Sequence, residues 1–130
     1  MKGDRAENEL ASPCLCTALR EASRAVIGLY DEELRNCGLR MTQYSLLDRL
    51  GFVGEVRQCD LGRMLSLDET TLTRSLRRLM DAGWVGVNPG EDGREKAVRL
   101  TKSGTAKLRQ SRLAWERAQR RICSRRDVAR

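Results

Sequence analysis

Residues 65–101 constrain the fold of this chain more than any other stretch, because they join a helical pattern to a strand pattern. Leu72, Leu76 and Leu79 recur at i, i+4 and i+7, which is the spacing of one buried helical face. Asp68 precedes this pattern and is suited to cap the helix, since its side chain can accept a hydrogen bond from an unpaired backbone N–H. We therefore predict an amphipathic helix that begins after residue 68.

A β-hairpin is predicted directly after this helix. Gly83 ends the helical pattern, and two strand patterns follow at 84–88 and 95–101. The intervening residues 89–94 include glycines, which permit a tight turn. A basic helix followed by such a hairpin is the arrangement of a helix-turn-helix with a β-hairpin wing.

Helical patterns occupy most of the remaining chain. They are expected at 13–36, 43–53, 58–65 and 102–125. Thr42 and Thr101 are placed to cap the second and the last of these helices. The predicted order is therefore α-α-α-α-β-β-α, a mainly α fold with a small β-hairpin.

We expect a disordered tail at 1–12 and a single domain at 13–130, with the winged helix-turn-helix at 42–101. The helices at 13–37 and 102–126 each carry an apolar seam that the small middle region cannot cover. Packing against a second copy would bury both seams, so we predict a homodimer. The seam residues are Leu15, Leu19, Ala22, Val26 and Leu29 in the first helix, and Leu108, Trp115 and Ile122 in the last.

Positive charge is concentrated in the second half of the chain. The whole chain carries a formal net charge of +7. Residues 1–59 hold 8 Lys/Arg against 9 Asp/Glu, whereas residues 60–130 hold 17 against 9. Such a basic half favours a polyanionic partner, nucleic acid above all, although a surface tuned for solubility would have the same composition.

The side chains opposite the buried leucines at 72–79 suit DNA. Arg can bond a guanine edge through two parallel N–H donors, and the Thr methyl group can pack on a thymine methyl group. A guanidinium at the hairpin tip suits the narrow minor groove, and Asp92 is spaced to brace Arg94 there. The alternatives are a solvated helical face and a plain polar turn. The predicted DNA-contacting residues are Thr70, Thr71, Thr73, Arg74, Arg77 and Arg78 on the helix, and Asp92, Gly93, Arg94 and Lys96 on the wing.

With these motifs the chain resembles the multiple-antibiotic-resistance regulator (MarR) family of winged-helix repressors over about residues 16–122. The matching segments are Thr42–Leu47, Leu67–Arg74, Leu79–Gly83, Asp92–Arg94 and Val98–Thr101, with Gly104 after them. The resemblance implies a homodimer on a pseudo-palindromic DNA operator, usually a repressor released by a small molecule or by thiol oxidation.

The chain departs from the family pattern at three places. Val87 stands where the family often has a basic residue, which would remove one phosphate contact. Gly62 replaces the usual Ala, which would loosen the helix at 58–65. The sequence ends at Arg130, where the family usually continues into another helix of the dimer interface.

The cysteines are the first of two candidate sensing features. Five cysteines without a secretion signal predict reduced thiols, and the absence of His excludes a Cys-His enzyme. Cys14 and Cys16 are expected in the first turn of a helix, where the positive end of the dipole favours thiolate. Two residues at i and i+2 point about 200° apart on a helix, so they would not chelate one ion well. The alternative is that both are small apolar residues in the dimer seam.

The second candidate is a ligand pocket between the end helices and the winged helix, which the family resemblance implies for anionic aromatic molecules. The residues that would line it are Tyr30, Arg40, Met41, Tyr44 and Trp84. The same side chains would serve equally as core and hinge, and sequence spacing does not decide between these roles.

We interpret the sequence as a cytoplasmic, sequence-specific regulator that binds double-stranded DNA, needs no cofactor or metal and has no membrane segment. The effector would be a small aromatic molecule or an oxidant. The alternative is a winged-helix module whose basic face docks an acidic protein. An enzyme is not expected, because the sequence has no metal triad, nucleotide-binding loop or nucleophile–base pair.

Overall fold

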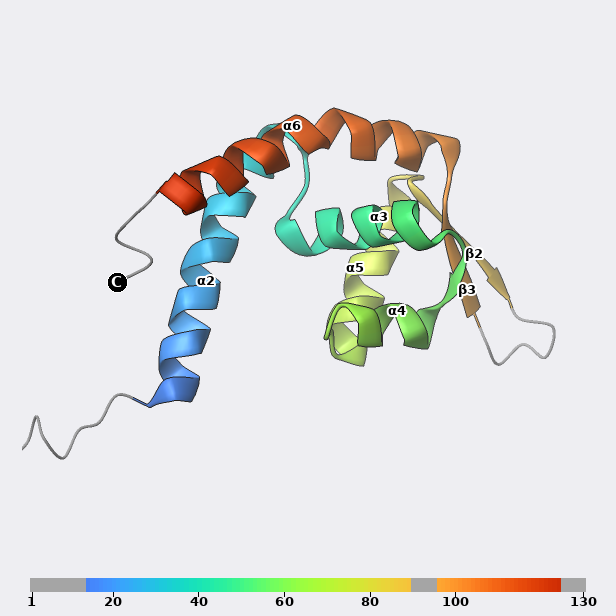
Figure 1. Cartoon of the computed structure of the whole chain (residues 1–130). Coiled ribbons are helices and arrows are strands. Elements are labelled where there is room, and N and C mark those ends of the chain that lie inside the picture. The colour runs from blue at the N-terminus through green and yellow to red at the C-terminus, as the bar shows by residue number, and fades with distance from the viewer. Residues whose placement is uncertain (1–13, 90–95, 125–130) are drawn as a thin grey trace, which may run out of the picture.

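The computed structural model describes residues 14–89 and 96–124, so the expected tail at 1–12 lies outside the described residues. Its elements follow the order predicted from sequence, with one additional strand, and are arranged as an arch in which α6 spans the top (Figure 1). They are α2 (Leu15–Leu34), a 3-10 turn η1 (Arg35–Cys37), α3 (Met41–Val53), β1 (Val56–Arg57), α4 (Gln58–Met64), α5 (Glu69–Asp81), β2 (Val85–Pro89), β3 (Lys96–Leu100) and α6 (Lys102–Ser124).

The sheet has three strands rather than the two that were predicted. Its order is β1-β3-β2 and both pairings are antiparallel. Val98 in the central strand faces Val56 of β1 and Val87 of β2, and it is fully buried. The sequence analysis missed β1 because two residues are too few to show an alternating pattern. This strand is the outer strand next to β3, and it directly precedes α4.

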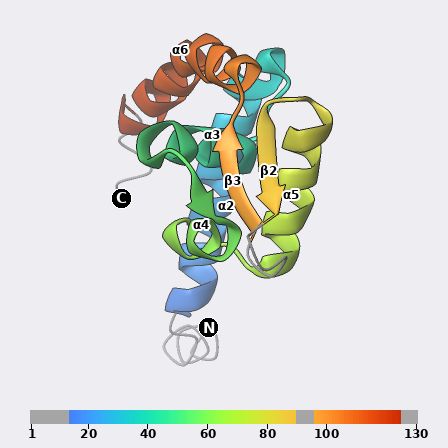
Figure 2. The same cartoon turned by 90° about the vertical axis from the view of Figure 1, so that its right-hand side faces the viewer.

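The core lies between the sheet and the helices of the middle region (Figure 2). The predicted inner face of α5 is confirmed, since Leu72, Leu76 and Leu79 are at most 3% exposed. They pack with leucines from α3 and α4, including the fully buried Leu47 and Leu61. A nearly continuous aliphatic core fixes the orientation of α5, and hence of the face that α5 presents to solvent.

Two helix starts show how capping sets the boundaries. Asp68 caps α5 as predicted, because its Oδ1 accepts the backbone N–H of Thr71 at 2.7 Å. The prediction that Thr42 caps α3 is wrong, since α3 begins one residue earlier, at Met41. There the Asp31 carboxylate accepts the backbone N–H of Met41 at 2.7 Å, a contact from another helix that local sequence does not reveal.

The end of β3 is tied to the end of α5 through Thr101. The Thr101 hydroxyl donates to the carbonyl of Gly83 at 2.6 Å and accepts the backbone N–H of Gly104 at 3.0 Å, as the predicted cap of α6. The Thr101 N–H also donates to the carbonyl of Trp84 at 3.0 Å. A Cβ atom at Gly104 would overlap that carbonyl oxygen, so only glycine fits here.

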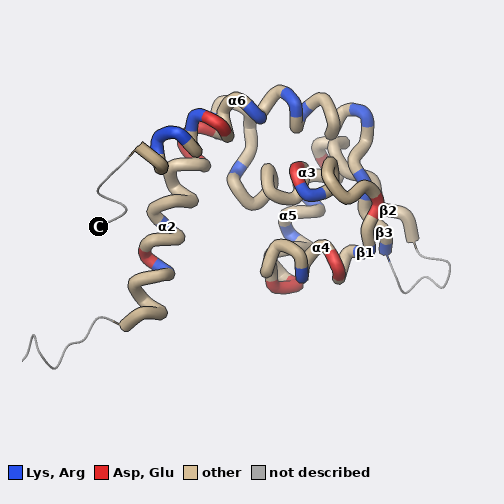
Figure 3. The backbone as a smooth tube through the Cα atoms, viewed as in Figure 1, with Lys and Arg blue, Asp and Glu red and all other residues tan. Residues whose placement is uncertain are grey.

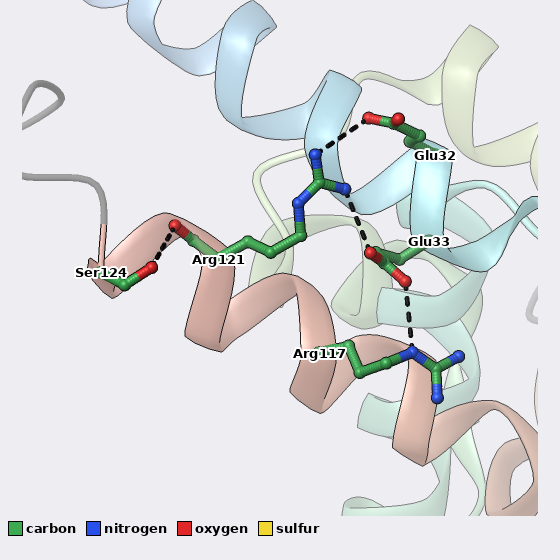
Figure 4. A network of polar contacts seen from close by, with 5 residues as sticks. All are labelled: Glu32, Glu33, Arg117, Arg121 and Ser124. Atoms are coloured by element: carbon green, nitrogen blue, oxygen red, sulfur yellow. Dashed lines mark hydrogen bonds and ion pairs between the residues drawn. The ribbon is translucent and has the colours of Figure 1, made fainter.

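α2 and α6 pack against each other only at the carboxyl-terminal end of each. Arg121 bonds Glu33 at 3.0 Å and Glu32 at 3.4 Å, and Arg117 bonds Glu33 at 3.2 Å (Figure 4). These hydrogen bonds from Arg117 and Arg121 hold the pKa of Glu33 below its usual range. The ion pairs therefore fix the junction at which α2 leaves the body of the molecule.

The amino-terminal part of the α2 seam is not buried in the single chain. Leu15 and Leu19 are 78% and 71% exposed, whereas Leu34 at the other end of the helix is fully buried. The seam predicted for α6 does turn inward, with Leu108 buried and Trp115 stacked on Tyr44 at 5.9 Å between ring centroids. Burial raises the pKa of Tyr44 to about 12. α2 thus carries apolar surface that the described part of this chain leaves uncovered.

No helix within residues 14–89 and 96–124 has both the length and the apolar character needed to cross a membrane.

Candidate nucleic-acid interface

The outer face of α5 presents hydroxyl and guanidinium groups to solvent. Thr70, Thr73, Arg74, Arg77 and Arg78 are all exposed, on the side away from the buried leucines. None of these three arginines forms an ion pair with a described residue, so their donors are available to a ligand. The predicted stripe is therefore present as a surface, although its contact with DNA stays a prediction.

Thr71 does not belong to this exposed stripe. It is only partly exposed, and both its backbone N–H and its hydroxyl donate to the Asp68 carboxylate, at 2.7 and 3.0 Å. These two bonds, the backbone one foremost, lower the pKa of Asp68. Thr71 thus fixes the first turn of α5, and its hydroxyl could donate to a base only by giving up the bond to Asp68 Oδ2.

The two strands of the wing lie within one residue of their predicted bounds, 84–88 and 95–101. β2 and β3 pair from Val85 and Leu100 to Pro89 and Lys96, and Lys96 is exposed at the start of β3. Asp92, Gly93 and Arg94, predicted at the tip, lie outside the described residues. Val87 is half-buried against the core, which explains an apolar residue at that position.

A side-chain contact links β2 of the wing to the loop that precedes β1. The Asn88 amide donates to the Glu55 carboxylate at 2.9 Å. Because Glu55 adjoins β1 and Asn88 lies in β2, this contact connects the two outer strands across β3. It helps to hold the hairpin at a fixed angle to α4 and α5.

A cavity of about 570 Å³ lies between α4, the first turns of α5 and β3. Its lining includes Arg57, Arg63, Thr73 and Lys96. The Asp60 carboxylate contacts Arg57 at 2.9 Å and Arg63 at 3.5 Å, so acidic and basic groups are already paired on this side of α5. Sequence reasoning did not place Arg57 and Arg63 here, because the pairing of β1 with β3 and the packing of α4 are long-range contacts.

Lys and Arg also occur on α6 and on the stretch that leads into α3 (Figure 3). Three of those on α6 have acidic partners, since Arg117 and Arg121 pair with Glu33 and Arg112 pairs with Asp48 at 3.8 Å. The arginines of α5, like Arg35 and Arg40, have no such partner among the described residues.

The structure places Cys14 just before α2 and Cys16 in the first turn of α2, and both are exposed. Cys14 is the extended residue before the helix rather than part of its first turn. Hydrogen bonds to Cys14 from Thr17, the backbone one foremost, lower the pKa of the Cys14 thiol. Both thiols are exposed in the single chain, so only contact with a second copy would bury them.

The aromatic residues predicted to line one ligand pocket each contact α6 in the structure. Tyr44 is buried on Trp115, Tyr30 bonds Gln119 through its hydroxyl, and Trp84 lies under the Lys107 ammonium at 5.0 Å. Burial is also the main cause that raises the pKa of Tyr30. All three side chains thus meet α6, at Trp115, Gln119 and Lys107, and the ligand pocket itself stays a prediction.

Arg40 instead lines another cavity, of about 450 Å³, between the end of α2, the start of α3 and α5. Asp31, Arg35 and Arg78 line the same cavity. No group of three metal-ligating side chains is found in the part of the chain that the structure describes.

The chain has the geometry of a winged helix, and comparison with known proteins identifies the family. A model of the MarR family matches residues 39–96. The crystal structure of the M. tuberculosis transcriptional regulator MosR in complex with DNA has 33% sequence identity and a TM-score of 0.77, and covers 89% of this chain and 91% of that one. The chain belongs to the MarR family.

Two further comparisons agree with MarR membership. An E. coli MarR variant complexed with operator DNA is 25% identical with a TM-score of 0.74, over 83% of this chain and 79% of that chain. An uncharacterized HTH-type transcriptional regulator of Bacillus subtilis, YwoH, is 35% identical over 89 residues, which are 68% of this chain. The chain spans 65% of the length of that relative. The resemblance and the fold class predicted from sequence are confirmed.

Proposed function

We propose that this chain is a DNA-binding transcriptional regulator, most simply a repressor, that acts as a homodimer in the cytoplasm. The observation that carries the proposal is the exposed face of α5, with Thr70, Arg74 and Arg77 opposite three buried leucines. A basic helix of this kind, presented by a short helix and a turn, suits the major groove. The DNA complexes of MosR and MarR support the same reading.

Each α5 would read one half of a pseudo-palindromic operator. Two copies reach successive major grooves when their α5 helices lie about 34 Å apart. The exposed Leu15 and Leu19 of α2 provide apolar surface that a second copy would cover, which supports a homodimer. Arg94 would enter the minor groove from the wing.

The experiment is a titration of the purified chain with fluorescent duplexes, using a site selected from a random library and a scrambled duplex. Arg74→Ala should lower the preference for the selected site, because one good base contact contributes about 1–3 kcal/mol of discrimination. Arg94→Ala should weaken binding by about 1–3 kcal/mol. Arg109→Ala on α6 is the control for loss of one positive charge.

Failure to bind either duplex at low salt would refute the proposal. It would favour the alternative, a module that docks an acidic protein through the same basic face. Equal loss on both duplexes in Arg74→Ala would instead make Arg74 a phosphate contact.

We further propose that a thiol-directed or small-molecule signal releases the DNA. Two observations support the thiol route: Cys14 and Cys16 are exposed, and hydrogen bonds stabilise the Cys14 thiolate. Cys14 should therefore react with iodoacetamide at lower pH than an ordinary cysteine thiol, as mass spectrometry of the Cys16→Ser variant would measure, with Cys14→Ser as the control. DNA affinity unchanged by hydrogen peroxide and by aromatic acids such as salicylate would remove both routes.

A further inference from the structure

A second cluster of arginines adjoins α5 on the side away from the wing. Arg35 from η1, Arg40 from the stretch before α3 and Arg78 from α5 line the same cavity of about 450 Å³. Arg78 lies one helical turn after Arg74, so the two are neighbours on the α5 surface. The cavity therefore opens beside the face that the proposed function assigns to DNA, although Arg35 and Arg40 come from outside the helix-turn-helix.

The charges in this cavity are not balanced internally. Arg35, Arg40 and Arg78 are all exposed, and none of them has an ion pair with any residue in the described ranges. The single carboxylate in the lining, Asp31, already accepts the backbone N–H of Met41 at 2.7 Å. Three guanidinium groups against one engaged carboxylate make an anion the expected occupant.

The position of the cluster relative to α5 indicates which anion. Thr73 lines the cavity of about 570 Å³ on the wing side of α5, and Arg78 lines the cavity of about 450 Å³ on the other side. These two residues are five positions apart, which corresponds to about 140° around the helix axis. The two cavities therefore flank the exposed stripe. A helix in the major groove has a row of phosphates on each side of it, because the groove is bounded by both strands.

An enclosed small-molecule site fits the cavity less well. All three arginines are exposed, and among the described residues no buried side-chain oxygen or nitrogen is left without a hydrogen-bond partner. A pocket built for a small polar ligand usually aims a few such groups inward. An open, cationic surface beside a groove-reading helix is suited instead to the continuous negative charge of a nucleic-acid backbone.

We propose that Arg35, Arg40 and Arg78 contact the phosphate backbone of DNA, on the strand that lies on the α2 side of α5. The DNA interface would then extend from the winged helix onto η1 and the start of α3. This inference rests on the proposed function. It adds Arg35 and Arg40, which lie outside the helix and wing, and assigns Arg78 of α5 to phosphate rather than to a base.

The test is the salt dependence of DNA binding in the full chain. Arg35→Gln, Arg40→Gln and Arg78→Gln are titrated with the selected and scrambled duplexes between 50 and 200 mM NaCl. Each lost phosphate contact should lower the slope of log Kd against log salt by about 0.9. Affinity should fall by the same factor on both duplexes, because a phosphate contact carries no sequence information.

Arg109→Gln is the matched control. Arg109 is an exposed arginine in another cavity that also holds three arginines and one aspartate, between α3 and α6, with no residue from α5. The Arg109→Gln substitution removes the same charge and should leave the salt slope of DNA binding unchanged. Thermal unfolding midpoints close to wild type would show that the variants remain folded.

Wild-type slopes in all three variants, or a slope change in Arg109→Gln as large as theirs, would overturn the inference. The inference would also be overturned if the cavity binds a free anion instead of DNA. In that case inorganic phosphate, added at constant ionic strength, would weaken DNA binding by the wild type but not by Arg40→Gln, and the salt slopes of the variants would equal that of the wild type. Failure of the proposed function is distinguishable, because the wild type itself would then bind neither duplex.

Discussion

Gly104 is the position at which a single methyl group should most disturb the fold. It lies in the first turn of α6, against the carbonyl group of Trp84 at the end of the α5–β2 turn. A Cβ atom there would overlap the carbonyl oxygen and lie 2.8 Å from the carbonyl carbon. Both atoms belong to backbone, so neither can swing away as a flexible side chain would. Gly104→Ala must push α6 and β2 apart.

The expected loss of stability follows from three contributions. Overpacking of this kind costs about 1–3 kcal/mol. Displacement of the Trp84 carbonyl also weakens its hydrogen bond from the Thr101 N–H, now 3.0 Å, which contributes about 1 kcal/mol. Replacing Gly by Ala in a helix returns at most about 1 kcal/mol. The net loss in the free energy of unfolding is about 2 kcal/mol.

The assay is thermal unfolding at fixed protein concentration, followed by circular dichroism. For a chain of this size a loss of 2 kcal/mol lowers the midpoint by roughly 8 °C. The control is Gly28→Ala in the middle of α2, where a Cβ atom would meet nothing within 4 Å. The same chemical change should there raise stability by up to about 1 kcal/mol. A Gly104→Ala midpoint equal to or above that of the wild type would refute the steric reasoning.

Three other predictions follow from capping, ionisation and exposed apolar surface. Asp68→Ala should destabilise the fold at neutral pH, as urea unfolding would detect. Because the folded pKa of Asp68 is lowered, its contribution is present above the unfolded pKa and is lost as pH falls through the folded value; equal wild-type and variant stability at pH 7 would contradict this. Tyr44, with its pKa raised to about 12, should ionise above the usual tyrosine range in an absorbance titration, and stability should decline between about pH 10 and 12; Tyr44→Phe should remove that late absorbance change. Changing Leu15 and Leu19 together to Ser should shift sedimentation from dimer toward monomer, and an unchanged sedimentation coefficient would exclude this end of α2 from the dimer interface.

The sequence predicted best where one strong period decided the structure. The α5 pattern identified Leu72, Leu76 and Leu79 as buried and Asp68 as the cap, because a long helix with a clean apolar face leaves little choice. β1 was missed, since two residues have no period to detect. The pairing partner that makes Val56 a strand residue is Val98, forty-two positions away.

Long-range contacts also explain what sequence spacing left open at the candidate sites. The family resemblance grouped Tyr30, Tyr44 and Trp84, and only the structure shows that their partners are Gln119, Trp115 and Lys107, all on α6. Sequence spacing gives the direction of a side chain on its own helix and not the helix that it meets. Arg35 and Arg40 escaped the predicted DNA interface for the same reason, because only the tertiary fold brings them beside Arg78.

The Thr101 junction connects the two parts of the molecule on which the proposed function depends. Its hydroxyl donates to the carbonyl of Gly83, just after α5, and accepts the N–H of Gly104, in the first turn of α6. The other end of α6 is fixed to α2 by the ion pairs of Glu33. One helix is therefore bonded at one end to the element that would face DNA and at the other to the helix whose exposed leucines would meet a second copy. In the proposed homodimer, a change in how two copies pack along α2 would be passed through the Glu33 ion pairs to α6, and so to the separation of the two α5 helices. Because binding in two successive major grooves would depend on that separation, a signal at the amino-terminal end of α2 would have a mechanical route to DNA affinity.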